Sequence, residues 1–226
     1  MVKLFNSDYK EIIKDIKCDL IITDPPYLYE RGGGSKIFDC DALERKDRIM
    51  ENSDFGKEQI YEFMNISKQC MSNPQWYIFC SEKQLPFYLD WCVENKFLFN
   101  LITLEKQLSI LNRKRLSTNT EFVLRVYNWG CIFNKSENNS DYNRVIKFNR
   151  IKKQDKLYKQ QKPTEIIDIF TKFGSNEGDI IFDPFMGSGS VGESSLNNNR
   201  GFIGIEIDEN RYNISNKRLS KLKKEE

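Results

Sequence analysis

The chain has 226 residues, of which 39% are hydrophobic and 30% charged, and its net charge is +2. This composition excludes a disordered chain, and no apolar run approaches the roughly 20 residues that span a bilayer. With no histidine and six cysteines that form no C-x-x-C pair, the sequence predicts no metal site, and catalysis must use carboxylates, backbone groups or a cofactor. Residues 1–7 lack the apolar core of a signal peptide, and we expect a cytoplasmic protein with reduced cysteines.

Short β-branched and aromatic runs alternate with helical patterns along the chain. The runs predict strands over residues 2–5, 19–23, 76–80, 97–104, 121–127, 179–182 and 201–207. Apolar residues at helical spacing predict helices over residues 57–70, 83–94, 164–173 and 209–222. This alternation predicts an α/β fold with a mostly parallel sheet of seven strands covered by helices on both faces. Ligands of such sheets bind beyond the carboxyl ends of the strands.

The first candidate motif is Asp24-Pro25-Pro26-Tyr27, which ends the apolar run Leu20-Ile21-Ile22. A turn that only caps the strand is one interpretation, because Asp-Pro commonly starts a turn. The other is a reaction centre. Asp24 and the carbonyl of Pro25 can accept the two N–H groups of an exocyclic amine, and proline fixes these acceptors without adding a competing donor.

The second motif, Asp183-Pro184-Phe185-Met186-Gly187-Ser188-Gly189, follows the predicted strand 179–182 and precedes a helix. Glycines there allow positive φ and close approach of a ligand to the backbone. About twenty residues later Glu206 ends another predicted strand, where a carboxylate can accept hydrogen bonds from a ribose diol. The spacing does not match G-x-G-x-x-G, so a pyrophosphate is less well supported than a cationic cofactor. A tight structural turn is the alternative.

The two motifs together resemble the β group of amino-methylating DNA methyltransferases, in which DPPY precedes the glycine turn. The resemblance is strong in residues 1–30 and 160–220. It implies a Rossmann-like class I fold with circularly permuted motif order, S-adenosylmethionine as cofactor, and Asp24, Pro25, Pro26 and Tyr27 as catalytic residues, with Tyr27 facing a flipped base. The resemblance also implies a cofactor site made of Asp8, Lys162, Thr164, Asp183, Phe185, Gly187, Ser188, Gly189, Glu206 and Ile207.

Basic residues gather in two places between these motifs. They are Arg113, Lys114 and Arg115 in the first, and Lys147, Arg150, Lys152 and Lys153 in the second. At this density they suit DNA phosphates, although a solvated surface is the alternative. The resemblance implies a DNA-recognition segment over residues 129–160, between a catalytic half, 1–128, and a cofactor-binding half, 161–226, of one domain.

The sequence therefore predicts an enzyme that transfers a methyl group to N6 of adenine in double-stranded DNA. Adenine is favoured because the motif begins with Asp, whereas related enzymes that act on N4 of cytosine more often have Ser there. The alternatives are N4-cytosine methylation of DNA, N6-adenine methylation of RNA, and a catalytically silent nucleic-acid-binding subunit. The sequence leaves open whether the protein forms a homodimer and whether it has a cognate restriction enzyme.

Overall fold

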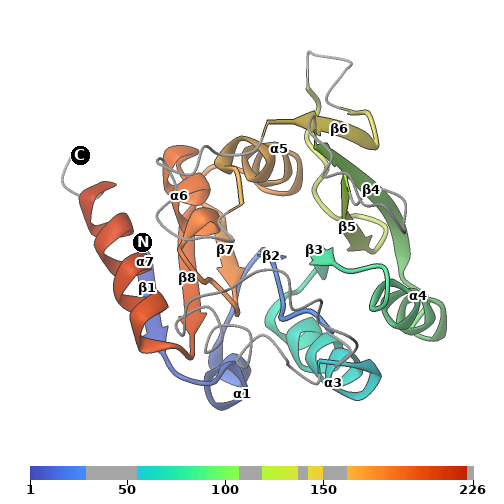
Figure 1. The fold of residues 1–226 in the computed structure, drawn as a ribbon, viewed down its shortest axis with the longest axis horizontal. Helices are drawn as coiled ribbons and strands as arrows, with labels where there is room; N and C mark the ends of the chain where they lie inside the picture. The colour runs from blue at the N-terminus through green and yellow to red at the C-terminus, as the bar shows by residue number, and fades with distance from the viewer. Residues whose placement is uncertain (29–54, 107–118, 137–141, 150–161, 223–226) are drawn as a thin grey trace, which may run out of the picture.

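A computed structural model describes residues 1–28, 55–106, 119–136, 142–149 and 162–222. Its strands are β1 (Val2–Asn6), β2 (Leu20–Thr23), β3 (Gln75–Cys80), β4 (Leu98–Lys106), β5 (Thr120–Tyr127), β6 (Val145–Phe148), β7 (Ile180–Asp183) and β8 (Gly201–Glu206). They form one sheet in the order β1-β8-β7-β2-β3-β5-β4-β6 (Figure 1). The first five strands of this order are mutually parallel, and β5 is antiparallel to both of its neighbours, β3 and β4.

Helices cover both faces of this sheet. They are α1 (Tyr9–Ile12), α3 (Lys57–Ser67), α4 (Leu85–Glu94), α5 (Thr164–Gly174), α6 (Ser190–Asn197) and α7 (Glu209–Leu222). One hydrophobic cluster joins α1, α3 and α4 to the sheet, and a second joins α5, α6 and α7 to its other face (Figure 1). Strand β2 is buried on both sides, with Ile21 in the first cluster and Leu20 and Ile22 in the second. A continuous apolar run is what such a strand requires.

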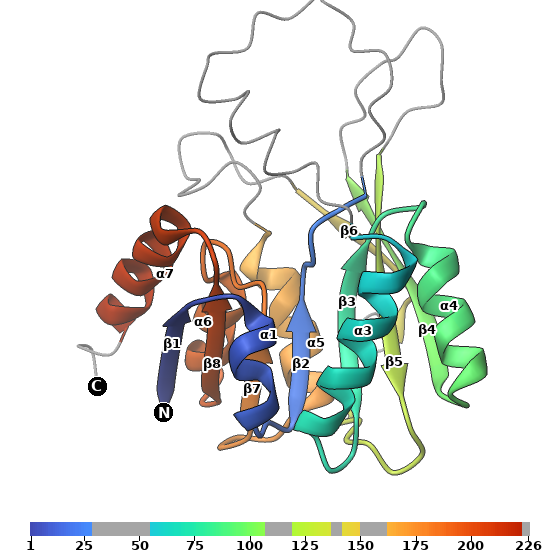
Figure 2. The same cartoon turned by 90° about the horizontal axis from the view of Figure 1, so that it is seen from below.

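The order of the strands places a switch point between β2 and β7. From β2 the chain passes through α3 to β3 on one side, and from β7 it passes through α6 to β8 on the other. The carboxyl ends of β2, β3 and β8 point toward the same end of the sheet (Figure 2). A crevice outside these ends, where successive crossovers diverge, is the usual ligand site of open α/β sheets.

The predicted α/β class is confirmed, with helices on both faces of the sheet, and α7 has the predicted bounds. The sequence reading missed β6, which makes eight strands instead of seven. This edge strand has four residues and alternates between exposed and half-buried positions, so it lacks the apolar signal of a core strand. Among the described residues, no helix is long and apolar enough to cross a membrane.

Candidate active site

The Asp24-Pro25-Pro26-Tyr27 turn leaves the sheet at the carboxyl end of β2. Asp24 Oδ2 lies 2.8 Å from Lys162 Nζ, while Asp24 Oδ1 is buried and has no hydrogen-bond partner in the described part of the chain. Buried acceptors are nearly always paired, so an unpaired carboxylate oxygen calls for a functional explanation. The turn thus presents a fixed carboxylate with one free acceptor.

Gln84 anchors this turn from the start of α4. Its Nε2 donates 2.8 Å to the carbonyl of Pro26 and 3.0 Å to the carbonyl of Phe55. Its Oε1 accepts from the backbone N–H and the hydroxyl of Ser81. Our sequence reading missed Gln84, although the Ser-x-x-Gln spacing before an apolar run is a helix-start signal that marks its side chain as structurally engaged.

Asp183 ends β7 beside the Asp24 turn. Strand β7 pairs with β2, and Thr23 Oγ1 donates 2.7 Å to Asp183 Oδ1, which also accepts from the Phe185 N–H at 3.0 Å. Burial raises the pKa of Asp183 to about 7, with further contributions from the carboxylates of Asp24 and Glu206. The Thr23–Asp183 hydrogen bond therefore joins the two motifs that are far apart in sequence.

The glycine turn and Glu206 orient each other. Gly187 and Gly189 have φ of +51° and +78°, a region that side chains other than glycine disfavour, and a Cβ on Gly189 would lie 3.0 Å from the Cβ of Ser215. Glu206 accepts from the N–H of Gly187 through Oε2 and from the N–H of Asp208 through Oε1, both at 2.9 Å. Burial raises the pKa of Glu206. Its carboxylate is thus preorganised at the end of β8.

The remaining residues of the expected cofactor site lie around this turn. Asp8 follows β1, whose last residue pairs with Glu206, and its carboxylate caps α1 by accepting from the Lys10 N–H at 3.0 Å. The ring of Phe185 packs 4.9 Å from that of Tyr9, centroid to centroid. Ser188 is buried, whereas Ile207 has a relative exposure of 67%. The chain thus collects these residues at the carboxyl ends of β1, β7 and β8.

Lys162 lies two residues before α5 and points its ammonium at the Asp24-Pro25-Pro26-Tyr27 turn. Besides Asp24, its Nζ lies 3.2 Å from the hydroxyl of Tyr27 and 3.5 Å from Glu121 Oε2. Burial lowers the pKa of Lys162, but Asp24 and Glu121 outweigh it and raise the pKa well above the usual value. These neighbours therefore favour the charged form of Lys162. Sequence reasoning did not connect Glu121 with this site.

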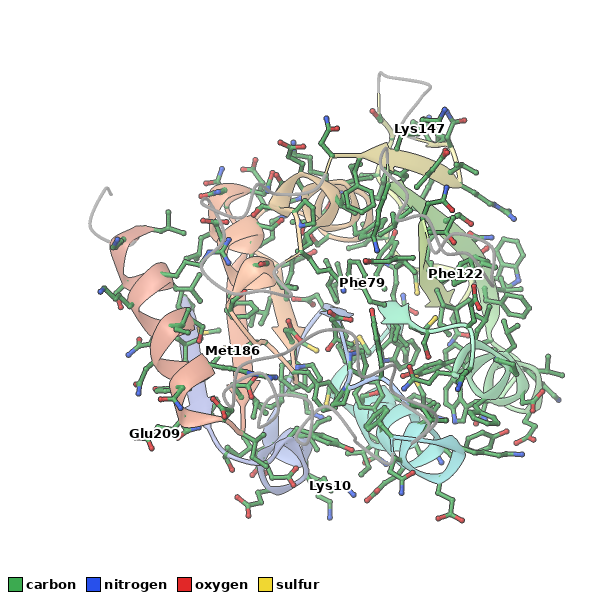
Figure 3. The ribbon with its side chains drawn as sticks, viewed as in Figure 1. Lys10, Phe79, Phe122, Lys147, Met186 and Glu209 are labelled. Carbon is green, nitrogen blue, oxygen red and sulfur yellow. The ribbon has the colours of Figure 1, made fainter. Side chains whose placement is uncertain are left out.

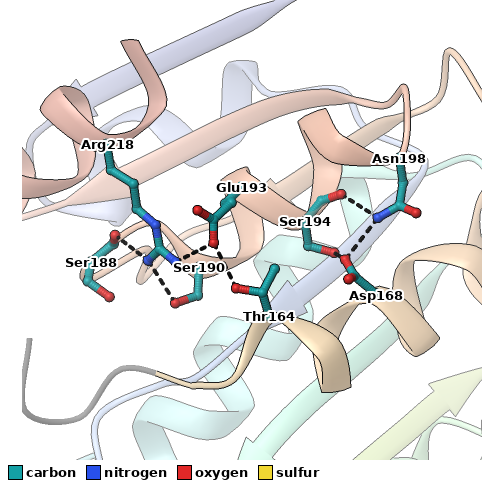
Figure 4. A network of polar contacts seen from close by, with 8 residues as sticks. All are labelled: Thr164, Asp168, Ser188, Ser190, Glu193, Ser194, Asn198 and Arg218. Carbon is teal, nitrogen blue, oxygen red and sulfur yellow. Dashed lines mark hydrogen bonds and ion pairs between the residues drawn. The ribbon is translucent and has the colours of Figure 1, made fainter. Parts of the chain in front are cut away.

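A polar network ties the start of α5 to the glycine turn (Figure 4). Thr164 Oγ1 donates 2.7 Å to Glu193, which is also ion-paired with Arg218. Arg218 Nη1 in turn donates to the carbonyl of Ser188 at 3.0 Å and to the hydroxyl of Ser190 at 3.1 Å. Glu193 and Arg218 were missed, because their partners come from other helices that the sequence alone does not bring together.

Most of the residues expected to contact DNA lie outside the described residues. These are Arg113, Lys114, Arg115, Arg150, Lys152 and Lys153. Lys147 is placed on β6, and its side chain has a relative exposure of 72% and lies 3.9 Å from Glu105. Figure 3 shows Lys147 at the β6 edge of the sheet, well apart from Met186 of the glycine turn.

The three carboxylates at the strand ends define what this site can hold. Asp24, Asp183 and Glu206 follow or end the strands β2, β7 and β8, and the buried Asp183 and Glu206 have raised pKa values. Ionising buried acids costs free energy, which a cation bound nearby would offset. Together with the free acceptor on Asp24, this pattern of acceptors and charges fits a positively charged cofactor beside an amine.

Comparisons with known proteins agree with this geometry. The sequence profile of the family described as DNA methylase (N6_N4_Mtase) matches residues 18–217. The type II methyltransferase M2.LlaDCHI of Lactococcus lactis subsp. cremoris is 27% identical over 237 residues, a match that spans 93% of this chain and 85% of that protein.

Solved structures show the same fold. The crystal structure of the M1.HpyAVI–SAM complex superposes with a TM-score of 0.72 at 27% identity, and the alignment covers 97% of this chain and 99% of that one. The cytosine-N4-specific PvuII DNA methyltransferase superposes with a TM-score of 0.76 at 12% identity, over 99% of this chain and 90% of that one. The second likeness concerns the fold alone. The profile match over most of the sequence places this chain in the DNA methylase family whose members modify exocyclic amino groups.

Proposed function

We propose that this protein transfers a methyl group from S-adenosylmethionine to N6 of adenine in double-stranded DNA. The observation that carries the proposal is the Thr23–Asp183 hydrogen bond, which holds the Asp24 turn beside the glycine turn. A methyl acceptor on one side and a methyl donor on the other would then meet at the switch point between β2 and β7. The continuous sheet supports one methyltransferase domain over residues 1–226, and we further propose that this domain acts on DNA in the cytoplasm.

Asp183, Glu206 and the glycine turn would hold the cofactor. S-adenosylmethionine supplies an electrophilic methyl group on a sulfonium. Burial raises the pKa of Asp183 to about 7, so its ionised form is costly at neutral pH. A cation bound nearby would stabilise that ionised form, and the carboxylate would in turn stabilise the bound cation. Glu206, with both oxygens already aligned by backbone N–H groups, keeps lone pairs for the hydroxyls of a ribose. Ile207 offers an exposed apolar surface to the adenine ring.

Asp24 and Pro25 would hold the target amine. The lone pair of this amine is delocalised into the purine ring, so the enzyme must draw the nitrogen toward tetrahedral geometry. Within the described residues, neither Asp24 Oδ1 nor the carbonyl of Pro25 has a hydrogen-bond donor, whereas the carbonyl of Pro26 accepts from Gln84. These two acceptors can take one N–H each. The nitrogen becomes acidic once methylated, so water or Asp24 can accept its proton.

The base must leave the duplex to reach these acceptors. We propose that the target adenine flips out of the helix and stacks on Tyr27, whose ring belongs to the same turn as Asp24. Unstacking costs a few kcal/mol, which contacts to the flipped base and to phosphates must offset.

Mass spectrometry of digested DNA tests the assignment. Purified protein, labelled S-adenosylmethionine and duplex DNA of mixed sequence should yield N6-methyladenine, and Asp24→Ala should yield none. N4-methylcytosine as the sole product would replace adenine by cytosine as the substrate. Transfer to RNA but not DNA oligonucleotides of the same sequence would replace the substrate class. Binding of DNA without any product would indicate a silent subunit.

A further inference from the structure

We propose that Lys162 and Glu121 are positioning residues for Asp24, so that Lys162 fixes one carboxylate oxygen and leaves the other for the target amine. This inference rests on the proposed function and deepens it. The two residues come from different parts of the chain, the segment before α5 and strand β5. The resemblance to known methyltransferases had instead associated Lys162 with the cofactor.

The contacts of Asp24 divide its two oxygens between two tasks. Oδ2 accepts from the Lys162 ammonium at 2.8 Å, and Oδ1 is buried with no partner in the described chain. Leaving a buried acceptor unpaired costs about 1–3 kcal/mol, which a fold would normally avoid. A free Oδ1 is nevertheless what the reaction needs, because an amine N–H must find an acceptor that no protein donor already occupies.

The ammonium of Lys162 is itself held from a second side. Glu121 Oε2 lies 3.5 Å from Nζ, and Glu121 Oε1 lies 2.6 Å from the Nζ of Lys106 on β4. Although burial raises the pKa of Glu121, Lys162 and Lys106 lower it below its usual value, so Glu121 stays ionised. Asp24, Lys162, Glu121 and Lys106 therefore form a chain of alternating charge from β2 to β4.

Aromatic rings limit the other positions that the ammonium can take. Nζ lies 5.1 Å from the ring centroid of Phe79 and 5.5 Å from that of Tyr27, and the Lys162 side chain has a relative exposure of only 15%. A lysine on a flexible stem would otherwise sample many rotamers. Held in this way, Lys162 fixes the plane of the Asp24 carboxylate relative to the base pocket, and a misplacement of about 1 Å there can cost about 100-fold in rate.

Lys162→Met and Glu121→Gln, singly and together, test this arrangement. Each single variant should lower kcat by about tenfold to 100-fold at saturating S-adenosylmethionine, with the KM for DNA and the Kd for S-adenosylmethionine changed less than about threefold. Because Glu121 acts through Lys162, adding Glu121→Gln to Lys162→Met should lower kcat no further. The matched control is Glu62→Gln, which breaks an exposed ion pair with Lys10 outside the site and should leave kcat unchanged.

Three results would overturn the inference. An unchanged or increased kcat in Lys162→Met would mean that Lys162 does not position Asp24. A loss confined to cofactor affinity would assign Lys162 to the cofactor site. An equal loss of kcat when Glu121→Gln is introduced into the unaltered protein and into the Lys162→Met variant would mean that Glu121 does not act through Lys162. If Lys162→Met does not fold, a comparison of kcat between Glu121→Gln and Glu62→Gln still tests the inference. The proposed function fails separately, when the unaltered protein methylates no DNA.

Discussion

Replacing Asp183 with asparagine should stabilise the ligand-free protein at neutral pH and weaken its binding of S-adenosylmethionine. The amide oxygen of asparagine can accept the same hydrogen bonds from Thr23 and Phe185 that Asp183 Oδ1 accepts, so the fold should persist. What the substitution removes is the buried acid whose pKa is raised from 3.8 to about 7.

The sign and size of the stability effect follow from this pKa. Below pH 3.8 Asp183 is protonated in both the folded and the unfolded protein, so its titration does not change the free energy of unfolding there. Between pH 3.8 and about 7 the unfolded chain loses the proton and the folded chain keeps it, so the free energy of unfolding falls by up to about 1.4 kcal/mol per pH unit. Above pH 7 the loss of unfolding free energy is complete at about 4 kcal/mol, and the Asp183→Asn variant, which has no acid at this position, should not show it.

Urea unfolding of the two proteins at pH 5, 6, 7 and 8 measures this difference. The variant should gain stability relative to the unaltered protein as the pH rises to 7, and the gain should then level off. Unfolding free energies that run parallel over this range would refute the assigned pKa. Calorimetric binding of S-adenosylmethionine completes the assay, with S-adenosylhomocysteine, which lacks the sulfonium charge, as the control ligand. Asp183→Asn should lose the preference for the charged ligand, and a retained preference would refute its role.

Three further variants address Asp24, Glu206 and the expected contacts with DNA. Asp24→Ala should abolish methyl transfer in a radiolabel assay while changing the Kd for S-adenosylmethionine less than about threefold; a large loss of cofactor affinity would contradict the division of roles. Glu206→Gln should weaken cofactor binding by about tenfold in calorimetry, because a charge-assisted hydrogen bond to the ribose becomes a neutral one, and unchanged affinity would remove Glu206 from the site. Neutralising Lys152 and Lys153 together should lower the slope of log K against log salt by about 0.9 per lost phosphate contact, whereas an unchanged slope would place the DNA elsewhere.

The sequence predicted the placement of those candidate site residues that lie at the ends of strands. Asp24 and Asp183 were placed at carboxyl ends of predicted strands, and β2 and β7 do pair in parallel, which sets the two carboxylates at the same edge. Such placement is predictable because period and turn residues mark the strand ends locally. The same reasoning missed β6, whose four residues lie in a basic, half-exposed segment.

The sequence did not predict the roles of residues whose partners are distant in the chain. Glu121 opens the predicted strand 121–127 and looks there like any polar residue at a strand end, and only the folded chain brings it to Lys162. Arg218 likewise reads as part of the basic face of a terminal helix, yet it is buried and holds the glycine turn. No local pattern encodes pairings of this kind, because they depend on which elements become neighbours in the sheet.

The double donation by Gln84 couples two segments that are distant in the sequence. Its side-chain amide donates to the carbonyl of Pro26, just after β2, and to the carbonyl of Phe55, just before α3. Because one side chain holds both carbonyls, the end of the Asp24 turn and the segment that leads into α3 depend on the same amide group. Loss of this amide would therefore release both segments at once.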